Sequence, residues 1–511
     1  EQPQTPEWKK VNDAIGKQLP QTAIQELEPL IKSALEARNY AEAAKAIALK
    51  ISLEGTIQGS KPEERITRLE AVLPDLPDGI QPLMEAVLGH WYWDFFQQNR
   101  WRFMQRRSTS QPPGEDINSW DLTRILAEID EHFTAALHSE AALQQVPIEQ
   151  FDALLVKGTM PDAARPTLYD FLVHEALTFY TAGEQAGAMV QDAFVLQADS
   201  PIFAPTAEFL AWQIESPDTD SPLVKAIHLF QKLAAFHQAD ADPTALAEAE
   251  FDRLVFGYNQ SVGEEKNARY KAALQQFVQR WDSQPISARA REAWGQVLHS
   301  ERQLVEARQV ALPGWERFPD TPGGNLCYNL IRAIEGREFQ VSTERVWNNP
   351  WPTIQVHYRN LTTAHFRAVR YDWEKLLTRE NYVPGAMPPQ LREELVARQP
   401  DLAWSQDLPA TEDYLPVNQS FPVPDKLPPG FYLLLASPHE DFRAEDNVVL
   451  ACEFWVSPLA IVVRTGGRAA PAEGFVLDAD TGEPLAGAQV RVWTLKRQTR
   501  RYRWTEGQGT R

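Results

Sequence analysis

The first two-thirds of the chain carries apolar residues at every third or fourth position, which is the spacing of helices that bury one face. Residues 22–51 contain two such stripes, with a break at Arg38 and Asn39 between them. Further amphipathic segments cover residues 120–137, 166–179, 222–236, 243–258, 267–281 and 286–318. Segments rich in Pro, Ser, Gly or Asp interrupt them at residues 108–116, 157–165 and 215–221. This pattern predicts a helical region over residues 1–335.

Within this region the helices look paired. The stretch NYAEA at residues 39–43 lies between two apolar stripes and resembles the turn of a tetratricopeptide hairpin, as does the end of the last pair at residues 317–323. The pairs differ in length, which argues against a strict consensus repeat. We therefore predict an irregular α-solenoid or helical bundle made of tetratricopeptide-like pairs.

The periodicity changes from helical to alternating near Gly336. Ile354, Val356 and Tyr358 alternate with polar residues, and residues 448–456 do the same. Short strands between proline-rich turns predict a first antiparallel β-sandwich over residues 336–458. We expect residues 373–429 to form a polar insertion, part helix and part loop. No apolar residue at 335–337 ties the two regions together, so we expect them to separate there.

A second β-module is predicted over residues 459–511, with too few strands for a closed sandwich. The apolar run 475–477 and the alternating run 488–492 flank a turn at Asp478–Gly482, which predicts that the two runs pair as a hairpin. Ala488, Val490 and Val492 would then face the core and Arg491 would face water. On this interpretation Val490→Asp costs about 3 kcal/mol or more, because it buries an unpaired carboxylate.

Composition narrows the classes of function. The formal net charge is −20 and the pI is near 5.0, which argues against nucleic acid and against anionic membrane surfaces as partners. The sequence has no apolar run of transmembrane length. Two cysteines, Cys327 and Cys452, are too few for a disulfide framework, so we interpret them as free, buried thiols. A disulfide that joins them is the alternative.

The candidate chemical motifs are incomplete. His174-Glu175 has the start of a zinc-protease helix motif, but the second histidine is replaced by Thr178, so a histidine on a polar helix face is the preferred interpretation. The sequence has no GxSxG elbow, Walker loop or GxGxxG motif. We therefore expect no catalytic, cofactor-binding or metal-binding residues, no cofactor and no enzymatic activity.

Two further motifs have structural explanations. The aromatic run at residues 91–96 precedes Arg100, Trp101, Arg102, Arg106 and Arg107, a composition that could stack bases and bind phosphates. The acidic total favours a buried helix end instead. Asn360 and Asn418 lie in glycosylation sequons, which carry no meaning in a bacterial protein, the source that we expect.

An ordered set of stretches is similar to the large bacterial alpha-2-macroglobulin family, in the branch with a helical N-terminal region. The set runs from about Trp120 onward and includes 165–177 (RPTLYDFLVHEAL), 318–327 (FPDTPGGNLC), 356–360 (VHYRN), 427–433 (LPPGFYL), 454–459 (FWVSPL) and 474–493. The resemblance implies a protease trap, in which macroglobulin-like sandwiches hold a cleavable bait and often a thioester domain. Cleavage of the bait then encloses the protease.

The chain departs from that pattern in its active parts. Neither Cys327 nor Cys452 lies in a CxEQ thioester sequence, and no YRPGQ-like strand is present. We therefore expect an N-terminal scaffold portion of a longer, exported protease inhibitor in the periplasm or at the cell surface, without bait or thioester residues of its own. Its partners would be proteases. The alternative is a docking module whose helical region binds another envelope protein.

Overall fold

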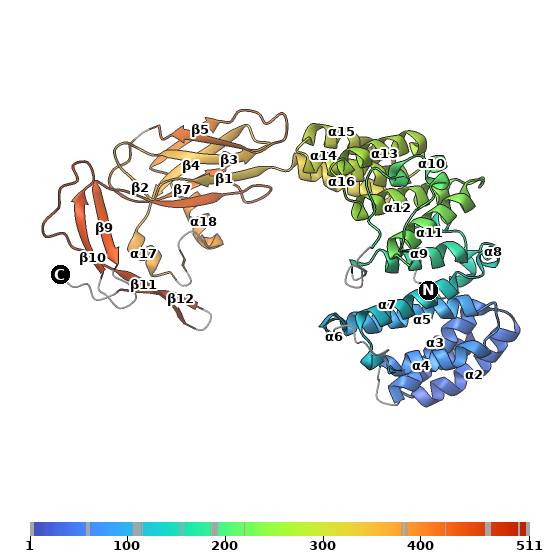
Figure 1. The fold of residues 1–511 in the computed structure, drawn as a ribbon. Coiled ribbons are helices and arrows are strands. Elements are labelled where there is room, and N and C mark those ends of the chain that lie inside the picture. The colour runs from blue at the N-terminus through green and yellow to red at the C-terminus, as the bar shows by residue number, and fades with distance from the viewer. Residues whose placement is uncertain are drawn as a thin grey trace. The chain divides into compact units, whose positions relative to one another are not determined.

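A computed structural model of the chain describes residues 5–506, apart from residues 58–61, 106–113, 115, 153, 156–157, 184, 186–192, 219, 380–381, 384–386, 425, 466–471 and 499–500. The chain forms two compact units (Figure 1). The helical unit comprises Glu1–Val297 and Pro313–Cys327, and the β-unit comprises Leu298–Leu312 and Tyr328–Arg511. Helices therefore precede antiparallel and mixed β-sheets, as predicted.

The helices follow the predicted apolar stripes closely. Their bounds are α1 (Pro6–Gly16), α2 (Pro20–Glu36), α3 (Tyr40–Ile57), α4 (Pro62–Val72), α5 (Gln81–Gln98), α6 (Arg100–Gln105), α7 (Leu122–Ala136), α8 (Glu140–Leu143), α9 (Leu168–Tyr180), α10 (Thr206–Ala211), α11 (Pro222–His237), α12 (Thr244–Gln260), α13 (Lys266–Trp281), α14 (Ile286–Ser300), α15 (Leu304–Arg317) and α16 (Pro322–Glu335). The predicted break between α2 and α3 contains Arg38 in the left-handed region, at φ 57°. No described helix has both the length and the apolar character that a bilayer crossing requires.

Local capping explains where the central helices begin. Asp121 accepts a hydrogen bond from the backbone N–H of Arg124 at the start of α7. Thr167 and Asp170 form a reciprocal capping box at the start of α9. Pro166 therefore stands before the cap, and the helix begins later than the predicted segment 166–179.

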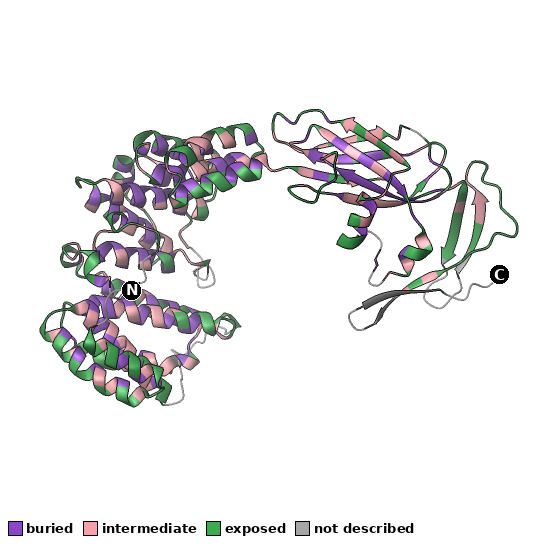
Figure 2. Ribbon diagram, turned by 180° about the vertical axis from the view of Figure 1, so that it is seen from behind, coloured by how far each residue is buried: buried purple, intermediate pink, exposed green. Residues whose placement is uncertain are grey.

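A large apolar core that is rich in aromatic residues extends through most of the helical unit. Figure 2 shows buried positions along these helices. The Phe133 ring on α7 stacks on Phe179 of α9 with centroids 5.6 Å apart. Tyr92, Phe95 and Phe96 of α5 are buried in the same core. The aromatic run 91–96 is thus a packed helix face, which confirms the structural interpretation.

The described strands of the β-unit belong to four sheets. Their bounds are β1 (Glu338–Ser342), β2 (Val346–Trp347), β3 (Thr353–Arg359), β4 (Thr363–Arg370), β5 (Leu402–Asp407), β6 (Val417–Pro422), β7 (Gly430–Ser437), β8 (Leu450–Val456), β9 (Leu459–Thr465), β10 (Ala472–Asp478), β11 (Trp493–Gln498) and β12 (Arg501–Glu506). The sheets have the orders β1-β3-β6, β2-β8-β7-β4-β5, β10-β9 and β11-β12. Only the β2–β8 pair among these is parallel.

The three-stranded and five-stranded sheets share one apolar core. Ile354, Val356 and Tyr358 of β3 bury their side chains in the same cluster as Phe366 of β4 and Phe454 of β8. The alternation that predicted these strands therefore marks the buried face of each sheet. Trp347 on β2 is fully buried and stacks on Phe454 with ring centroids 3.7 Å apart.

The prediction that residues 373–429 form an insertion of helix and loop is only partly correct. It holds two short helices, α17 (Trp373–Leu377) and α18 (Pro389–Val396), but also the edge strands β5 and β6. Both strands alternate half-buried with exposed residues, so their apolar pattern is weak. Their partners are far away in sequence: Phe421 of β6 pairs with Ile354 of β3, and Trp404 of β5 with Phe366 of β4.

The predicted hairpin between the runs 475–477 and 488–492 is wrong. β10 pairs with the preceding β9, with Val476 opposite Ile461, and β11 begins only at Trp493 and pairs with β12. Val490 is 48% exposed and Val492 52% exposed, so neither faces a core. The expected cost of Val490→Asp falls accordingly to the surface value of about 0.5 kcal/mol or less.

The turn at Asp478–Gly482 itself is confirmed. The Asp478 carboxylate accepts hydrogen bonds from the backbone N–H groups of Asp480 and Thr481, and Gly482 adopts φ 74°. After the turn the chain runs back along β10 for a short stretch, where the Leu485 N–H donates to the Val476 carbonyl. Arg491 is exposed, as predicted, and pairs with Glu506 at 2.9 Å and with Glu374.

The change from helix to strand falls at the predicted position. α16 ends at Glu335 and β1 begins at Glu338. Polar contacts cross this point within the β-unit: the Asn360 amide donates to the carbonyls of Ile334 and Gly336, each at 2.9 Å. The compact units are divided upstream of Gly336, because Leu298–Leu312 and the end of α16 from Tyr328 belong with the strands.

Candidate functional site

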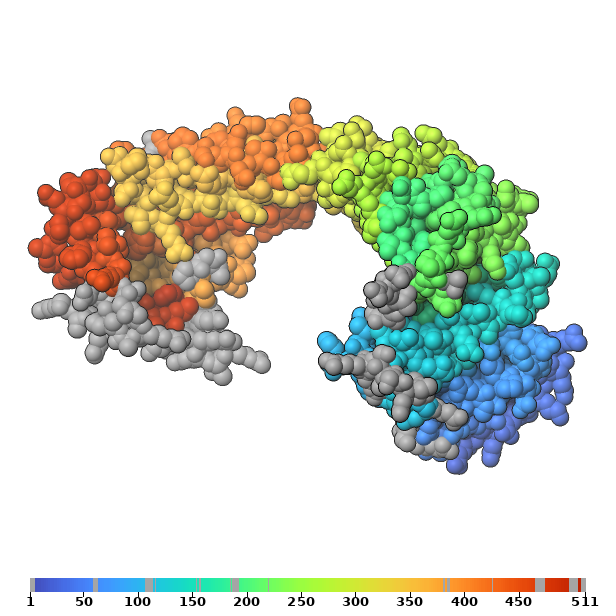
Figure 3. All heavy atoms as spheres, viewed as in Figure 1, coloured from blue at the N-terminus to red at the C-terminus, as the bar shows by residue number. Residues whose placement is uncertain are grey.

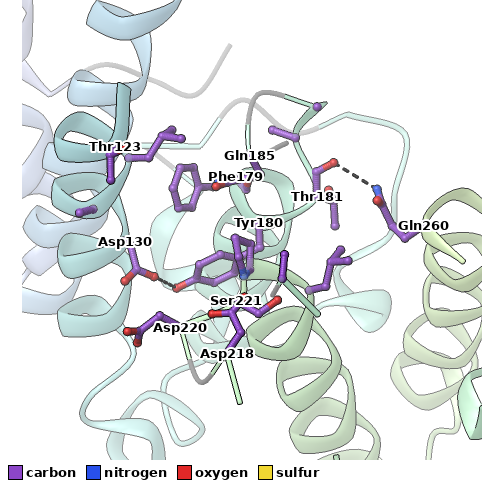
Figure 4. A pocket seen from close by; sticks show the side chains of 17 residues that line it. Thr123, Asp130, Phe179, Tyr180, Thr181, Gln185, Asp218, Asp220, Ser221 and Gln260 are labelled. Atoms are coloured by element: carbon purple, nitrogen blue, oxygen red, sulfur yellow. Dashed lines mark hydrogen bonds between the residues drawn. The ribbon is translucent and has the colours of Figure 1, made fainter. Parts of the chain in front are cut away.

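Two neighbouring cavities in the helical unit share one wall, the side chain of Tyr180 at the end of α9. The first cavity, of about 500 Å³, lies between α7, the end of α9 and the start of α11 (Figure 4). The second, of about 830 Å³, lies along α11 next to the end of α7. Both have the size of pockets that hold a side chain or a short peptide segment. We call the two together the Tyr180 groove.

The floor of the first cavity is apolar. Leu126 and Ala127 of α7, Phe179 of α9 and Leu223 of α11 contribute to it. Helical spacing on α7 brings Thr123, Leu126, Ala127 and Asp130 to the same wall, because residues three and four apart lie on one face.

Polar groups hold the centre of the groove in place. The Tyr180 hydroxyl donates to Asp130 Oδ1 at 2.8 Å, as Figure 4 shows. Lys225 Nζ of α11 lies 2.9 and 2.7 Å from the two Asp130 oxygens and neutralises this carboxylate. Burial, and then the charge of Asp130, raise the pKa of Tyr180, so the phenol stays a neutral donor.

Negative charge collects at the mouth of the first cavity. Asp218 and Asp220 both line it, and the Asp220 side chain is 94% exposed. Lys225 is 4.0 Å from Asp220 but has its closer contacts with Asp130. The described lining residues of this cavity include no histidine, cysteine or lysine, and its polar groups are hydroxyls, amides and carboxylates. The arrangement is suited to binding.

A buried ionic network lies beside the groove and fixes α9 against α11. Asp170 is 1% exposed, and its Oδ1 lies 2.7 Å from Nε2 of His237, which is 2% exposed. The other imidazole nitrogen of His237 lies 2.7 Å from Asp240. Burial opposes a charge on His237, but the hydrogen bonds and charges of Asp170 and Asp240 outweigh it and raise the pKa of His237.

The histidine of the incomplete zinc motif belongs to the same region. His174 is buried rather than on a polar helix face, which corrects the prediction. Its Nδ1 lies 2.7 Å from the Asp170 carbonyl and its Nε2 lies 3.5 Å from Asp252, while Glu175 pairs with His90 instead. Among the described residues, a group that could hold a cation lies at another place in the helical unit. It consists of Glu70, Glu128 and His132, which the sequence analysis did not single out.

The other candidate residues are structural or lie outside the described part. Cys327 and Cys452 are both free thiols, which agrees with the preferred interpretation and not with the alternative disulfide. Burial raises the pKa of Cys327 to about 12 and that of Cys452 to about 11, which makes both poor nucleophiles. Arg102 lies over the Phe95 ring, and Trp101 is 79% exposed. Arg106 and Arg107 lie outside the described residues.

The two sequon asparagines differ in their surroundings. The Asn360 side chain is used in the hydrogen bonds to Ile334 and Gly336. Asn418 is exposed on β6, and its Oδ1 lies 2.8 Å from Nδ1 of His357.

Comparison with known proteins finds no match: no protein-family model, no curated protein and no solved structure is similar enough to this chain to be assigned to it.

Proposed function

We propose that the chain is the scaffold portion of a macroglobulin-type protease trap, a protein that encloses an endopeptidase and catalyses nothing itself. The observation that carries the proposal is the β-unit, in which a three-stranded and a five-stranded sheet share one apolar core. Such a pair of sheets fits an antiparallel β-sandwich of the macroglobulin-like kind. In the same proposal the paired helices form an irregular α-solenoid, and the protein works outside the cytoplasm.

The β9–β10 ribbon supports the same proposal. Ile461, Val462 and Val463 of β9 and Phe475 of β10 are each more than half exposed, on both faces of a two-stranded sheet. Figure 2 shows exposed and half-buried positions along these strands, which are the red strands β9 and β10 of Figures 1 and 3. A two-stranded ribbon is marginal by itself, and exposed apolar patches usually mark a contact surface. In a trap, neighbouring macroglobulin-like strands would cover this ribbon.

The trap proposal predicts a dissociation between large and small substrates. The complete gene product, incubated in excess with trypsin, should block cleavage of casein. It should leave cleavage of a small chromogenic peptide intact, because an enclosed protease still admits small molecules. Residues 1–511 alone should block neither, since they contain no CxEQ sequence or recognisable bait.

The contradicting outcomes are specific. Casein cleavage that the gene-encoded protein leaves unchanged, with trypsin and with an elastase, would refute the trap. Stoichiometric protection by residues 1–511 alone, or an adduct at Cys327 or Cys452, would refute the scaffold role of this chain.

A second candidate function rests on the Tyr180 groove: docking of an extended peptide segment of an envelope protein. Its apolar floor suits one aliphatic side chain, and Asp218 and Asp220 at the mouth suit a basic neighbour. The chain's net charge of −20 attracts a basic segment from a distance.

For the docking function, a fluorescein-labelled peptide of alternating Leu and Lys should bind the chain and raise its fluorescence anisotropy, whereas the same peptide with Glu for Lys should not. The double variant Asp218→Asn/Asp220→Asn should weaken binding about threefold to tenfold, and less at high salt. Ala127→Phe, at an exposed position on the cavity floor, should abolish binding by filling the space.

Asp75→Asn/Asp78→Asn is the matched control. Both positions are exposed and line neither cavity, and the change in net charge is identical. Equal weakening by the two double variants would show that only overall charge matters and would refute docking in the groove.

A further inference from the structure

Three potential ligand side chains meet between the first helices of the helical unit. Glu70 of α4, Glu128 of α7 and His132 of α7 each offer one ligand atom, and these atoms all lie within 4.8 Å of one another. Glu128 and His132 are four residues apart on one helix, so they project from the same face. Glu70 comes from a different helix and lies 58 residues before Glu128 in the sequence.

His132 is oriented in the manner of a metal ligand. Its Nδ1 lies 2.7 Å from Glu85 Oε2 of α5, so Nδ1–H donates to this carboxylate and Nε2 is the nitrogen that can bind an ion. The Tyr92 ring stacks on the imidazole, with centroids 5.4 Å apart. Together these contacts fix both the tautomer and the plane of the ring.

The nitrogen that faces the carboxylates has no hydrogen bond. His132 Nε2 is shielded from solvent and lacks a hydrogen-bond partner, and it lies 3.9 Å from Glu128 Oε1. This separation is too long for a hydrogen bond. Two ligands of a tetrahedral Zn²⁺ lie about 3.3–3.6 Å apart, since each bond is about 2.0–2.2 Å long, so a side-chain shift of about half an ångström would bring both atoms onto one ion. A buried acceptor without a donor has an energetic cost that a cation would remove.

Negative charge surrounds this nitrogen. Glu70 accepts a hydrogen bond from the Tyr92 hydroxyl, and Arg124 pairs with Glu128. The side chains of Glu128 and Glu85 are 13% and 19% exposed. Glu70, Glu85 and Glu128 thus place three carboxylates near this nitrogen, and Arg124 offsets the charge of one of them.

We propose that Glu70, Glu128 and His132 bind one divalent transition-metal ion, Zn²⁺ by ligand type, with Glu85 as the hydrogen-bond acceptor that orients the histidine. One imidazole and two carboxylates make a three-ligand set that leaves a position for water. The site ties α4 to α7 and is independent of the protease-trap and docking functions. It revises the expectation that the chain has no metal-binding residues.

Cobalt provides the direct test, because Co²⁺ in a four- or five-coordinate site absorbs visible light. Titration of the full chain with Co²⁺ should produce absorption bands that saturate at one equivalent and disappear when Zn²⁺ is added. Isothermal titration with Zn²⁺ should give the same stoichiometry. Absence of both signals from the wild-type chain would overturn the proposal.

Variants locate the ion. Glu128→Gln and His132→Gln should each weaken Zn²⁺ binding at least tenfold, and Glu85→Gln should weaken it about tenfold through the lost orienting contact. Glu70→Gln keeps an oxygen that accepts from Tyr92, so it is the variant least prone to misfold. Glu131→Gln, at an exposed position of α7, is the control and should bind as the wild type does.

Circular dichroism of each variant separates loss of the ligand from loss of the fold. Folded Glu70→Gln and Glu128→Gln variants that bind Zn²⁺ within about twofold of the wild type would place the ion elsewhere and overturn the site.

Discussion

Asp170→Ala should destabilise the helical unit by about 3–5 kcal/mol. The change leaves the imidazole of His237, which is 2% exposed, without its buried partner, and breaking a buried ion pair from one side costs about that much. It also removes the capping box with Thr167, whose loss costs about 1 kcal/mol at a typical helix start. Urea unfolding followed by far-UV circular dichroism measures the effect.

Asp240→Ala is the matched control, because Asp240 contacts the other nitrogen of the same His237 and its side chain is 38% exposed. A half-exposed ion pair contributes about 1 kcal/mol or less. Equal, small effects of the two alanine variants would show that burial of the Asp170–His237 pair has no special role.

Asp170→Asn isolates the charge, since asparagine keeps the size and an acceptor oxygen. The pKa of His237 is raised in the folded chain, so its stabilisation is fully present below its unfolded value of 6.5 and is lost as the pH rises through the folded value. The stability difference between wild type and Asp170→Asn should therefore be largest below about pH 6.5 and should shrink above it. A difference that grows with pH would contradict the assignment.

Trp347→Ala should have a comparable effect on the β-unit, about 3–5 kcal/mol. The indole is fully buried between the sheets and stacks on Phe454, and its Nε1–H donates to Thr343 Oγ1 at 3.0 Å. Removal leaves a cavity in the core that the two sheets share. Hydrogen exchange of the β7 and β8 amides should quicken by about 10²-fold to several thousandfold, because 1.4 kcal/mol corresponds to tenfold.

Val346→Ala is the control on the same strand. Val346 is 39% exposed, and its truncation should change stability by about 0.5 kcal/mol or less. If Trp347→Ala leaves exchange in β7 and β8 unchanged, the two sheets do not depend on a common core, and the sandwich in the proposed function loses its support.

The helical region of the chain could be predicted in detail because the sequence signals of a helix are local. The stripes that begin and end α2, α7 and α11 lie within single segments, and so do caps such as Asp121. The strands β3 and β8 were predicted for the same reason, since alternate residues of each pack against one core. The turn at Asp478–Gly482 needs only its own side chains and a glycine at positive φ.

Pairing was not predictable, because a strand's partner is chosen by the rest of the fold. The run 475–477 fits a hairpin with residues 488–492 as well as one with β9, and the structure pairs it with β9. β5 and β6 have weak alternation and gain their place from β4 and β3, which lie far away in sequence. Burial of His174 depends likewise on its packing in the helical unit and not on its own helix.

The candidate sites illustrate the same division. The sequence by itself determined that α7 places Glu128 beside His132, and Thr123 beside Ala127, because helical spacing requires it. Only the tertiary structure brought Glu70, Glu85 and Tyr92 against the first pair, and Tyr180 and Lys225 against the other face at Asp130. A helix specifies which of its own residues share a face. Which faces of different helices meet is decided by the packing of apolar side chains, and the polar candidate ligands have no part in that packing.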